Sequence, residues 1–193
     1  MAAYPVNCGM FKGTIRVARE SDAEAMAAIY APIVQDTGIS FEVDPPGPEE
    51  MARRLRAILP THPWLVAEQA GRVIGYAYSG KHRDRAAYRW SVDVSAYVDA
   101  QARRKGAGLA LYETLIVLLK QQGFHSAFAG IALPNEASVE FHQAAGFTPL
   151  GIYKEVGFKQ GQWRDVGWWR LGLSNSLDAP GEPIAFEALP KPL

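Results

Sequence analysis

The chain has 193 residues, and its 20 lysines and arginines balance 20 aspartates and glutamates, so the formal net charge is zero. This balance excludes a general positive field that would hold nucleic acid or an anionic membrane, so any anion must be bound by a local site. The length allows one domain with a full core but not two of ordinary size. We expect a single domain over residues 13–173, between a flexible N-terminus (1–12) and a proline-rich tail (174–193).

Both ends of the chain are consistent with a cytoplasmic protein. The first residues, MAAYPVNCGMFK, lack the basic start and the apolar run of a signal peptide. No window approaches the roughly 20 apolar residues that cross a bilayer. Cys8 is the only cysteine, which rules out an internal disulfide and suits a reducing compartment. The tail has little periodicity, so we expect it to be either disordered or draped over the domain.

The first half of the chain predicts the order β-α-α-β-β. Ser21-Asp-Ala-Glu24 has the form of a capping box that opens a helix, and Pro48 fits the first turn of a second helix. The short connection Gln69-Ala-Gly-Arg72 predicts an antiparallel hairpin. The predicted elements are a strand at 14–18, helices at 21–33 and 48–59, and strands at 64–68 and 73–78.

The second half predicts the order β-α-β-α-β-β. Apolar residues recur at helical spacing from Leu109 to Leu119, and Gly123 ends the pattern as a left-handed C-cap would. The predicted elements are a strand at 88–98, this helix, a strand at 126–133, a short helix at 135–146 and two strands flanking 159–162. The whole order implies the α/β (α+β) class, with one central, largely antiparallel sheet and helices on both faces.

A basic, glycine-containing turn joins the strand that ends at Val98 to the following helix. The free N–H groups and the positive end of that helix would point at one spot, which suits a phosphate. Gly106 and Gly108 would let a pyrophosphate approach, while Arg103, Arg104 and Lys105 could reach its oxygens. A solvated basic turn before an amphipathic helix is the alternative, because short glycine patterns are common.

Two spaced motifs carry a family resemblance. Arg103-x-x-Gly106-x-Gly108, followed by Asn135-x-x-Ser138-x-x-x-His142-x-x-x-Gly146-Phe147, resembles the GNAT-type N-acetyltransferase superfamily. Further segments look like its phosphinothricin/methionine-sulfone N-acetyltransferase family, namely 63–68, 87–90, 96–98, 133–135, 138–139 and 157–167. The resemblance covers most of the chain. It implies the GNAT fold, a mixed, mostly antiparallel twisted sheet whose central strand splays from its neighbour to form a cofactor cleft.

The resemblance also implies where acetyl-CoA would bind as co-substrate. The pyrophosphate would lie on the glycine turn, and the pantetheine arm would pair with exposed backbone as an added strand does. Asn135 and Ser138 would lie beside the thioester, although Asn135 could also be a simple helix cap. The implied cofactor residues are Ala96, Tyr97, Val98, Arg103, Arg104, Lys105, Gly106, Ala107, Gly108, Leu109, Asn135 and Ser138.

Acetyl transfer requires a neutral amine, so the enzyme needs a proton acceptor. By resemblance, Asp93 stands where close relatives carry glutamate, and it could act directly or through a water; the alternative is a strand-edge charge paired with an arginine. His142 stands where the superfamily usually has a tyrosine that protonates the leaving thiolate. A histidine can do the same or take the amine proton, since it titrates near neutrality. The alternative for His142 is simple packing.

For the carboxylate of the acceptor, the resemblance offers Arg83 and Arg85 in the loop before Tyr88, with Phe41 as an apolar wall. Arginine suits carboxylates because its fork donates two parallel hydrogen bonds, although an ordinary exposed loop would also carry such cations. Relatives are usually dimers, and the tryptophans Trp163, Trp168 and Trp169 would line core or a subunit contact.

We therefore expect a cytoplasmic, acetyl-CoA-dependent N-acetyltransferase without a metal, acting on the α-amine of a small amino-acid analogue. Phosphinothricin, methionine sulfone and methionine sulfoximine are the implied acceptors, with direct transfer because no nucleophilic cysteine lies in the motif. The partners would be this small molecule and a second copy of the chain, not nucleic acid or a membrane. The alternatives are another amine (a polyamine, an aminoglycoside or a protein N-terminus) and a non-catalytic CoA-binding sensor.

Overall fold

The computed structural model describes Tyr4, residues 11–176 and residues 178–190. Cys8 and most of the predicted flexible N-terminus lie outside the described residues. Tyr4 forms an isolated bridge to Ile15, and Phe11 is buried in the core. No helix within the described ranges is long and apolar enough to cross a membrane.

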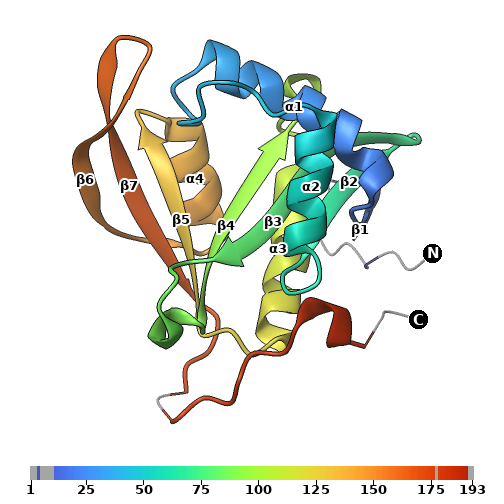
Figure 1. Cartoon of the computed structure of the whole chain (residues 1–193), viewed down its shortest axis with the longest axis vertical. Coiled ribbons are helices and arrows are strands. Elements are labelled where there is room, and N and C mark those ends of the chain that lie inside the picture. Colours follow the sequence, from blue (N-terminus) through green and yellow to red (C-terminus); the bar gives the residue numbers. More distant parts are fainter. Residues whose placement is uncertain (1–3, 5–10, 177, 191–193) are drawn as a thin grey trace.

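The described part of the chain forms one seven-stranded sheet in the order β1-β2-β3-β4-β5-β7-β6 (Figure 1). The strands are β1 (Thr14–Val17), β2 (Trp64–Gln69), β3 (Arg72–Lys81), β4 (Ser91–Val98), β5 (Ser126–Leu133), β6 (Thr148–Lys159) and β7 (Gln162–Gly172). Neighbouring strands are antiparallel except for the parallel pair β4 and β5. The predicted mixed, mostly antiparallel sheet is confirmed.

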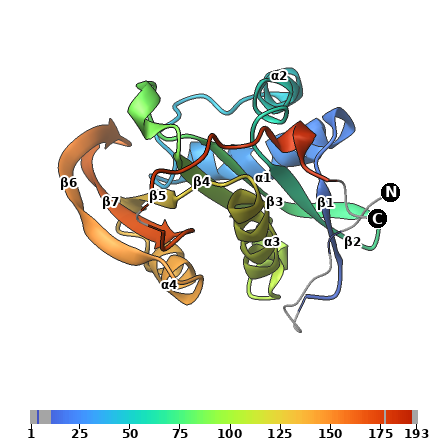
Figure 2. The same ribbon diagram turned by 90° about the horizontal axis from the view of Figure 1, so that it is seen from below.

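Four α-helices cover the two faces of this sheet in the described ranges, as predicted. They are α1 (Ala23–Asp36), α2 (Pro48–Ile58), α3 (Ala107–Gln121) and α4 (Glu136–Ala144). Helices α1 and α2 lie on one face, and α3 and α4 lie on the other (Figure 2). Each face has its own core: Leu111 and Leu115 of α3 pack into one, and Met26 of α1 and Leu55 of α2 pack into the other.

The predicted capping box at Ser21–Glu24 is wrong. Helix α1 begins at Ala23, and its N-cap, Asp22, makes no side-chain capping bond. The Asp22 carboxylate instead accepts two hydrogen bonds from the Arg16 guanidinium, at 2.7 and 2.9 Å, and one from the Arg19 backbone N–H at 2.8 Å. Ser21 lies in the 3₁₀ turn Glu20–Asp22 that precedes the helix. A contact with β1 therefore decides how α1 begins.

The predicted strand at 88–98 begins later, at Ser91. Tyr88 ends a 3₁₀ turn, Ala86–Tyr88, that follows the β3 strand. The carbonyl of Trp90 accepts the backbone N–H of His125 at 2.8 Å. This bond immediately precedes the first β4–β5 pair, Ser91 with Ser126. The residues before Ser91 therefore form a connection rather than a strand.

The tail, over residues 178–190, is draped over the domain. The Ile184 N–H donates to the Gln122 carbonyl at 2.8 Å, and the Gln122 amide donates to the carbonyls of Ile184 and Thr61 at 2.7 and 2.8 Å. Leu189 is buried against the α3 core. Of the two alternatives for the tail, the packed one is therefore correct for these residues.

Candidate active site

The parallel strands β4 and β5 pair over a short distance and then part. Their register joins Ser91–Asp93 to 126–128, and the last pair is Asp93 with Phe128. Beyond it, β4 is paired only with β3 as far as Val98, and β5 only with β7. The predicted splay is therefore present. The edge of β4 that faces β5 has no strand partner from 94 to 98, so it is open to an added extended chain.

The turn after β4 presents unpaired backbone N–H groups. Gly106 has φ of 81° and Arg104 has φ of 59°, so two residues of the turn adopt the left-handed conformation that glycine favours. None of the backbone N–H groups from 103 to 109 donates a hydrogen bond to another described residue. Such a series of free amides at the start of a helix is a typical anion site. This geometry fits the pyrophosphate site that the sequence predicts.

The three cations of the turn are exposed, and only one of them bonds within the described chain. The Lys105 ammonium donates to the Gln101 carbonyl at 3.0 Å, whereas Arg103 and Arg104 have no ion pair with a described residue. Asp99 is the acidic side chain in this segment, and it accepts the Gln101 backbone N–H at 2.8 Å. The positive charge of the turn is therefore available to an anionic ligand.

Gly108 has a packing reason that the sequence did not show. A Cβ at this position would lie 3.3 Å from Cε2 of Phe141 and 3.6 Å from Cγ2 of Val98. The residue thus lets the first turn of α3 approach α4 and β4 closely. Ala107 beside it is buried in the core, so only its backbone can face a ligand.

Asn135 and His142 organise α4 from its two ends. Asn135 caps the helix, with its Oδ1 accepting the Ser138 N–H at 3.2 Å. The Nδ1–H of His142 donates to the Ser138 carbonyl at 2.7 Å, and its Nε2 accepts from the Tyr112 hydroxyl at 3.0 Å. Burial lowers the pKa of His142, and the hydrogen bond to Ser138 only partly opposes this effect. His142 is therefore a buried residue whose two nitrogens are both engaged.

Asp93 has a partner that the sequence reasoning missed. His82 follows the last residue of β3, and its Nδ1 lies 2.5 Å from Oδ1 of Asp93. The His82 ring stacks on Phe128, with centroids 4.4 Å apart and planes inclined by 19°. Burial raises the pKa of Asp93, against the opposing effects of the His82 hydrogen bond and the nearby Arg83 charge. This His82–Asp93 pair lies where β4 and β5 part.

The antiparallel register could have indicated this pair. Lys81 of β3 stands opposite Val92, so His82 comes opposite Ser91. The side chains of Ser91 and Asp93 point to the same face of the sheet, which brings His82 beside Asp93. In the sequence, His82 appears only as one member of a basic loop. Recognising it requires the register of β3 against β4, which the pattern of residues alone does not give.

Two of the predicted acceptor residues lie near the His82–Asp93 pair. The Arg83 guanidinium lies over the Trp168 ring, 5.5 Å from its centroid, and Nη1 donates to the His82 carbonyl at 2.8 Å. The Tyr88 ring centroid is 6.0 Å from that of His82. Arg85 is exposed at the start of the 86–88 turn and has no ion pair with a described residue. This turn lies on the sheet face that α1 and α2 cover (Figure 2).

Phe41 lies in the loop between α1 and α2, against the β6–β7 hairpin. Its ring edge contacts the position that a Cβ on Gly157 would occupy. The same loop is held by Lys159, whose ammonium donates to the carbonyls of Val34, Ser40 and Glu42 at 2.6, 2.7 and 2.8 Å. Phe41 therefore packs on the β6–β7 hairpin. Its role as an apolar wall for the acceptor stays a prediction.

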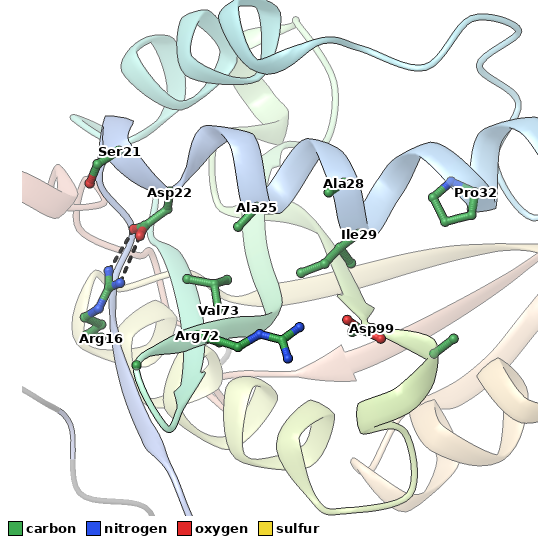
Figure 3. A pocket seen from close by; sticks show the side chains of 12 residues that line it. Arg16, Ser21, Asp22, Ala25, Ala28, Ile29, Pro32, Arg72, Val73 and Asp99 are labelled. Atoms are coloured by element: carbon green, nitrogen blue, oxygen red, sulfur yellow. Dashed lines mark hydrogen bonds and ion pairs between the residues drawn. The ribbon is translucent and has the colours of Figure 1, made fainter.

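A cavity of about 480 Å³ lies elsewhere, between α1, the β2–β3 turn and the end of β4 (Figure 3). Arg16 and Asp22 line it but are paired with each other, while Arg72 and Asp99 point toward one another. The residues that line this cavity include neither the His82–Asp93 pair nor the 103–108 turn. It is therefore distinct from the site at the splay.

Comparisons with known proteins agree with this architecture. The sequence pattern of the acetyltransferase (GNAT) domain matches residues 15–168. Phosphinothricin N-acetyltransferase of Streptomyces viridochromogenes is 38% identical over 170 residues, covering 88% of this chain and 92% of that protein. The L-methionine sulfoximine/L-methionine sulfone acetyltransferase of Pseudomonas aeruginosa is 35% identical over 173 residues, covering 86% of this chain and 98% of that protein.

Among solved structures, a GNAT superfamily phosphinothricin acetyltransferase from Sinorhizobium meliloti, crystallised in complex with acetyl-CoA, superposes with a TM-score of 0.85 at 34% identity. The match covers 90% of this chain and 96% of that one. Because the domain pattern spans most of the sequence and these relatives align over nearly their full lengths, the chain belongs to the GNAT acetyltransferase family.

Proposed function

We propose that this acetyltransferase uses acetyl-CoA to acetylate the α-amine of a small amino-acid analogue, with phosphinothricin, methionine sulfone and methionine sulfoximine as the first candidates. The observation that carries the proposal is the splay of β4 and β5, which has a turn of free N–H groups at one end and Asp93 at the other. The activities that name the related proteins support this substrate class.

The donor would bind along β4 and the start of α3. The unpaired edge at 96–98 suits the amides of the pantetheine arm, and the 103–109 amides with Arg103 and Arg104 suit the pyrophosphate. Asn135 and Ser138, where β5 leads into α4, would border the thioester. Acetyl-CoA supplies an activated acyl group, so the protein needs only to place the amine and remove its proton.

The acceptor would bind on the α1 and α2 face. Arg83 is exposed beside Asp93, so its guanidinium can pair with the acceptor carboxylate while the amine approaches Asp93. Arg85 and Tyr88 border the same region, and Phe41 would form its outer wall if the α1–α2 loop closes on the substrate. Asp93 is the proposed proton acceptor. We assign His142 a positioning role through Ser138, because both of its nitrogens are engaged.

Thiol release from acetyl-CoA tests this function. The purified protein is given a panel of free amino acids, phosphinothricin, methionine sulfone, methionine sulfoximine, a polyamine, an aminoglycoside and a short peptide. We expect release with the amino-acid analogues and intersecting double-reciprocal plots, as direct transfer in a ternary complex requires. Turnover only with the polyamine, aminoglycoside or peptide would replace the acceptor class. Tight CoA binding without turnover on any amine, unchanged in Asp93→Ala, would favour the sensor.

The proposal includes a homodimer that works in the cytoplasm, where acetyl-CoA is available. Apolar side chains on the β6–β7 hairpin support the dimer, because β6 is an edge strand of the sheet and exposed apolar patches mark contact sites. The exposed residues are Leu150, Ile152, Tyr153, Val156, Phe158 and Trp163. In light scattering, Phe158→Glu should shift the protein toward the monomer mass, and a wild-type monomer at micromolar concentration would refute the dimer.

A further inference from the structure

We infer that His82 is the group that receives the proton of the substrate amine, with Asp93 orienting its ring. This inference rests on the proposed function and refines it, because Asp93 then acts on the amine through His82 instead of accepting the proton directly. The two side chains meet at 2.5 Å between Nδ1 of His82 and Oδ1 of Asp93, at the last residue pair before β4 and β5 part.

The hydrogen bond fixes the tautomer of the His82 ring. An ionised carboxylate can only accept, so Nδ1 carries the proton when Asp93 is ionised. The lone pair of His82 then lies on Nε2, which has no hydrogen-bond partner among the described residues and is not sealed from solvent. A base oriented in this way by a carboxylate is a recurring arrangement in acyl-transfer enzymes.

The surroundings keep the ring in one orientation. His82 stacks on Phe128 of β5, while Tyr88 and Trp168 meet it edge-on, each with a centroid separation of 6.0 Å. Only 13% of the His82 side chain is exposed, against 37% for Asp93. The ring is therefore held by the Nδ1 contact with Asp93, and its Nε2 is left free. A histidine with only a packing role would need neither feature.

Two of the other three histidines differ in how their ring nitrogens are used. His142 uses both nitrogens within the core. His62 also stacks on a phenylalanine, Phe124, at 5.5 Å with planes inclined by 18°, but its Nδ1 contacts the Thr61 hydroxyl at 2.8 Å. Only His82 combines a carboxylate partner with a place at the splay.

The reaction balances with this assignment. The substrate ammonium gives one proton to Nε2 of His82, and the freed nitrogen lone pair forms the C–N bond to the acetyl carbonyl carbon. The C–S bond then breaks, and the sulfur leaves with the bonding electrons. The remaining ammonium-type proton on nitrogen goes to the thiolate, giving the amide and the free thiol. The imidazolium releases its proton to solvent before the next turnover.

The charged and titratable groups around the pair decide how a pH profile is read. The charge of Arg83 acts to lower the pKa of Asp93, and the charge of Asp93 acts to raise the pKa of Tyr78 of β3. Lys81 precedes His82 and pairs with Asp84 at 3.4 Å, and Tyr88 approaches from the 86–88 turn. Phe128 of β5 and Trp168 of β7 carry no charge. If part of the pH dependence of kcat/KM disappears when His82 is replaced, that part is therefore assigned to the His82–Asp93 pair.

The test compares His82→Phe, which keeps a stacking ring, with the control His62→Phe. We expect His82→Phe to lower kcat/KM for the amine about 10²-fold at neutral pH, as removal of a general base does, with unchanged acetyl-CoA affinity by calorimetry. The loss should shrink as the pH approaches the pKa of the amine, because the free amine then needs no base. Asp93→Asn should lower kcat/KM by a similar factor. The double variant should have a kcat/KM no lower than that of the less active single variant, because the two residues act as a unit.

His82→Gln, which is polar but does not titrate near neutrality, repeats the test if the phenylalanine variant melts early. An unchanged kcat/KM in either variant, or a loss that is the same at every pH, overturns the inference. If the wild-type protein acetylates no amine, the proposed function fails instead. Nitrogen-15 NMR then determines the tautomer of the His82 ring directly. An Nδ1–H tautomer that is lost in Asp93→Asn supports the inference, and an Nε2–H tautomer in the wild-type protein overturns it.

Discussion

Replacing Lys159 with methionine removes the three hydrogen bonds that tie the α1–α2 loop to the β6–β7 hairpin, while keeping an unbranched side chain of similar length. The Lys159 ammonium donates to the carbonyls of Val34, Ser40 and Glu42 at 2.6 to 2.8 Å. Hydrogen bonds to a charged group contribute about 1.5–3 kcal/mol each, but the partly exposed carbonyls would recover water. We therefore expect Lys159→Met to cost about 3 kcal/mol in total, well below the sum of three bonds.

For a chain of this size, that loss should lower the melting temperature by about 6–12 °C in calorimetry. Because the loop also carries Phe41, the KM for the amine should rise while the KM for acetyl-CoA stays the same. Lys154→Met is the matched control: Lys154 pairs with Asp165 at 2.7 Å, but its side chain is 71% exposed. Such an exposed pair contributes little to stability. Equal melting temperatures for the two variants would refute the reasoning.

Two further changes test the support of the fold and the cofactor turn. Asp22→Asn breaks a buried pair with Arg16 and should cost about 3–5 kcal/mol in urea unfolding. Burial alone would raise the pKa of Asp22, but the hydrogen bonds from Arg16 and Arg19 outweigh it and lower the pKa. The stabilisation from this carboxylate is thus complete above its unfolded pKa and is lost as the pH falls through the lower folded value. An equally steep acid loss in Asp22→Asn would contradict this. Gly106→Ala forces a side chain into the left-handed region, so acetyl-CoA binding by calorimetry should weaken while Gly47→Ala, at a position with open space, leaves it unchanged.

The order of elements and the cofactor turn were readable from the sequence because both depend on local pattern. Apolar spacing set the helices, and the cations and glycines of the turn stand next to one another in the chain. Gly108 has a packing role besides the predicted one, since it packs against Phe141 of α4. A contact across 33 positions cannot be read from the turn itself.

The missed features are all contacts between different structural elements. The sequence pattern places Asp22 inside a capping box, but its carboxylate accepts hydrogen bonds from Arg16 of β1. Lys159 bonds to residues more than 100 positions earlier in the chain. The sequence pattern shows His82 only as one member of a basic loop, whereas the register of β3 and β4 places it beside Asp93. Each of these polar groups has a role only because the sheet brings a partner to it.

The short pairing of β4 with β5 has a consequence for inhibitor design. The 103–108 turn leads into α3 on one face of the sheet, whereas the connection from β3 to β4 lies on the face of α1 and α2 (Figure 2). A single compound that joins the sulfur of CoA to an amino-acid amine would pass between β4 and β5. It would occupy the proposed CoA site and the proposed acceptor site at the same time. Its second half would bind at a high effective concentration, so it should outbind either fragment by orders of magnitude.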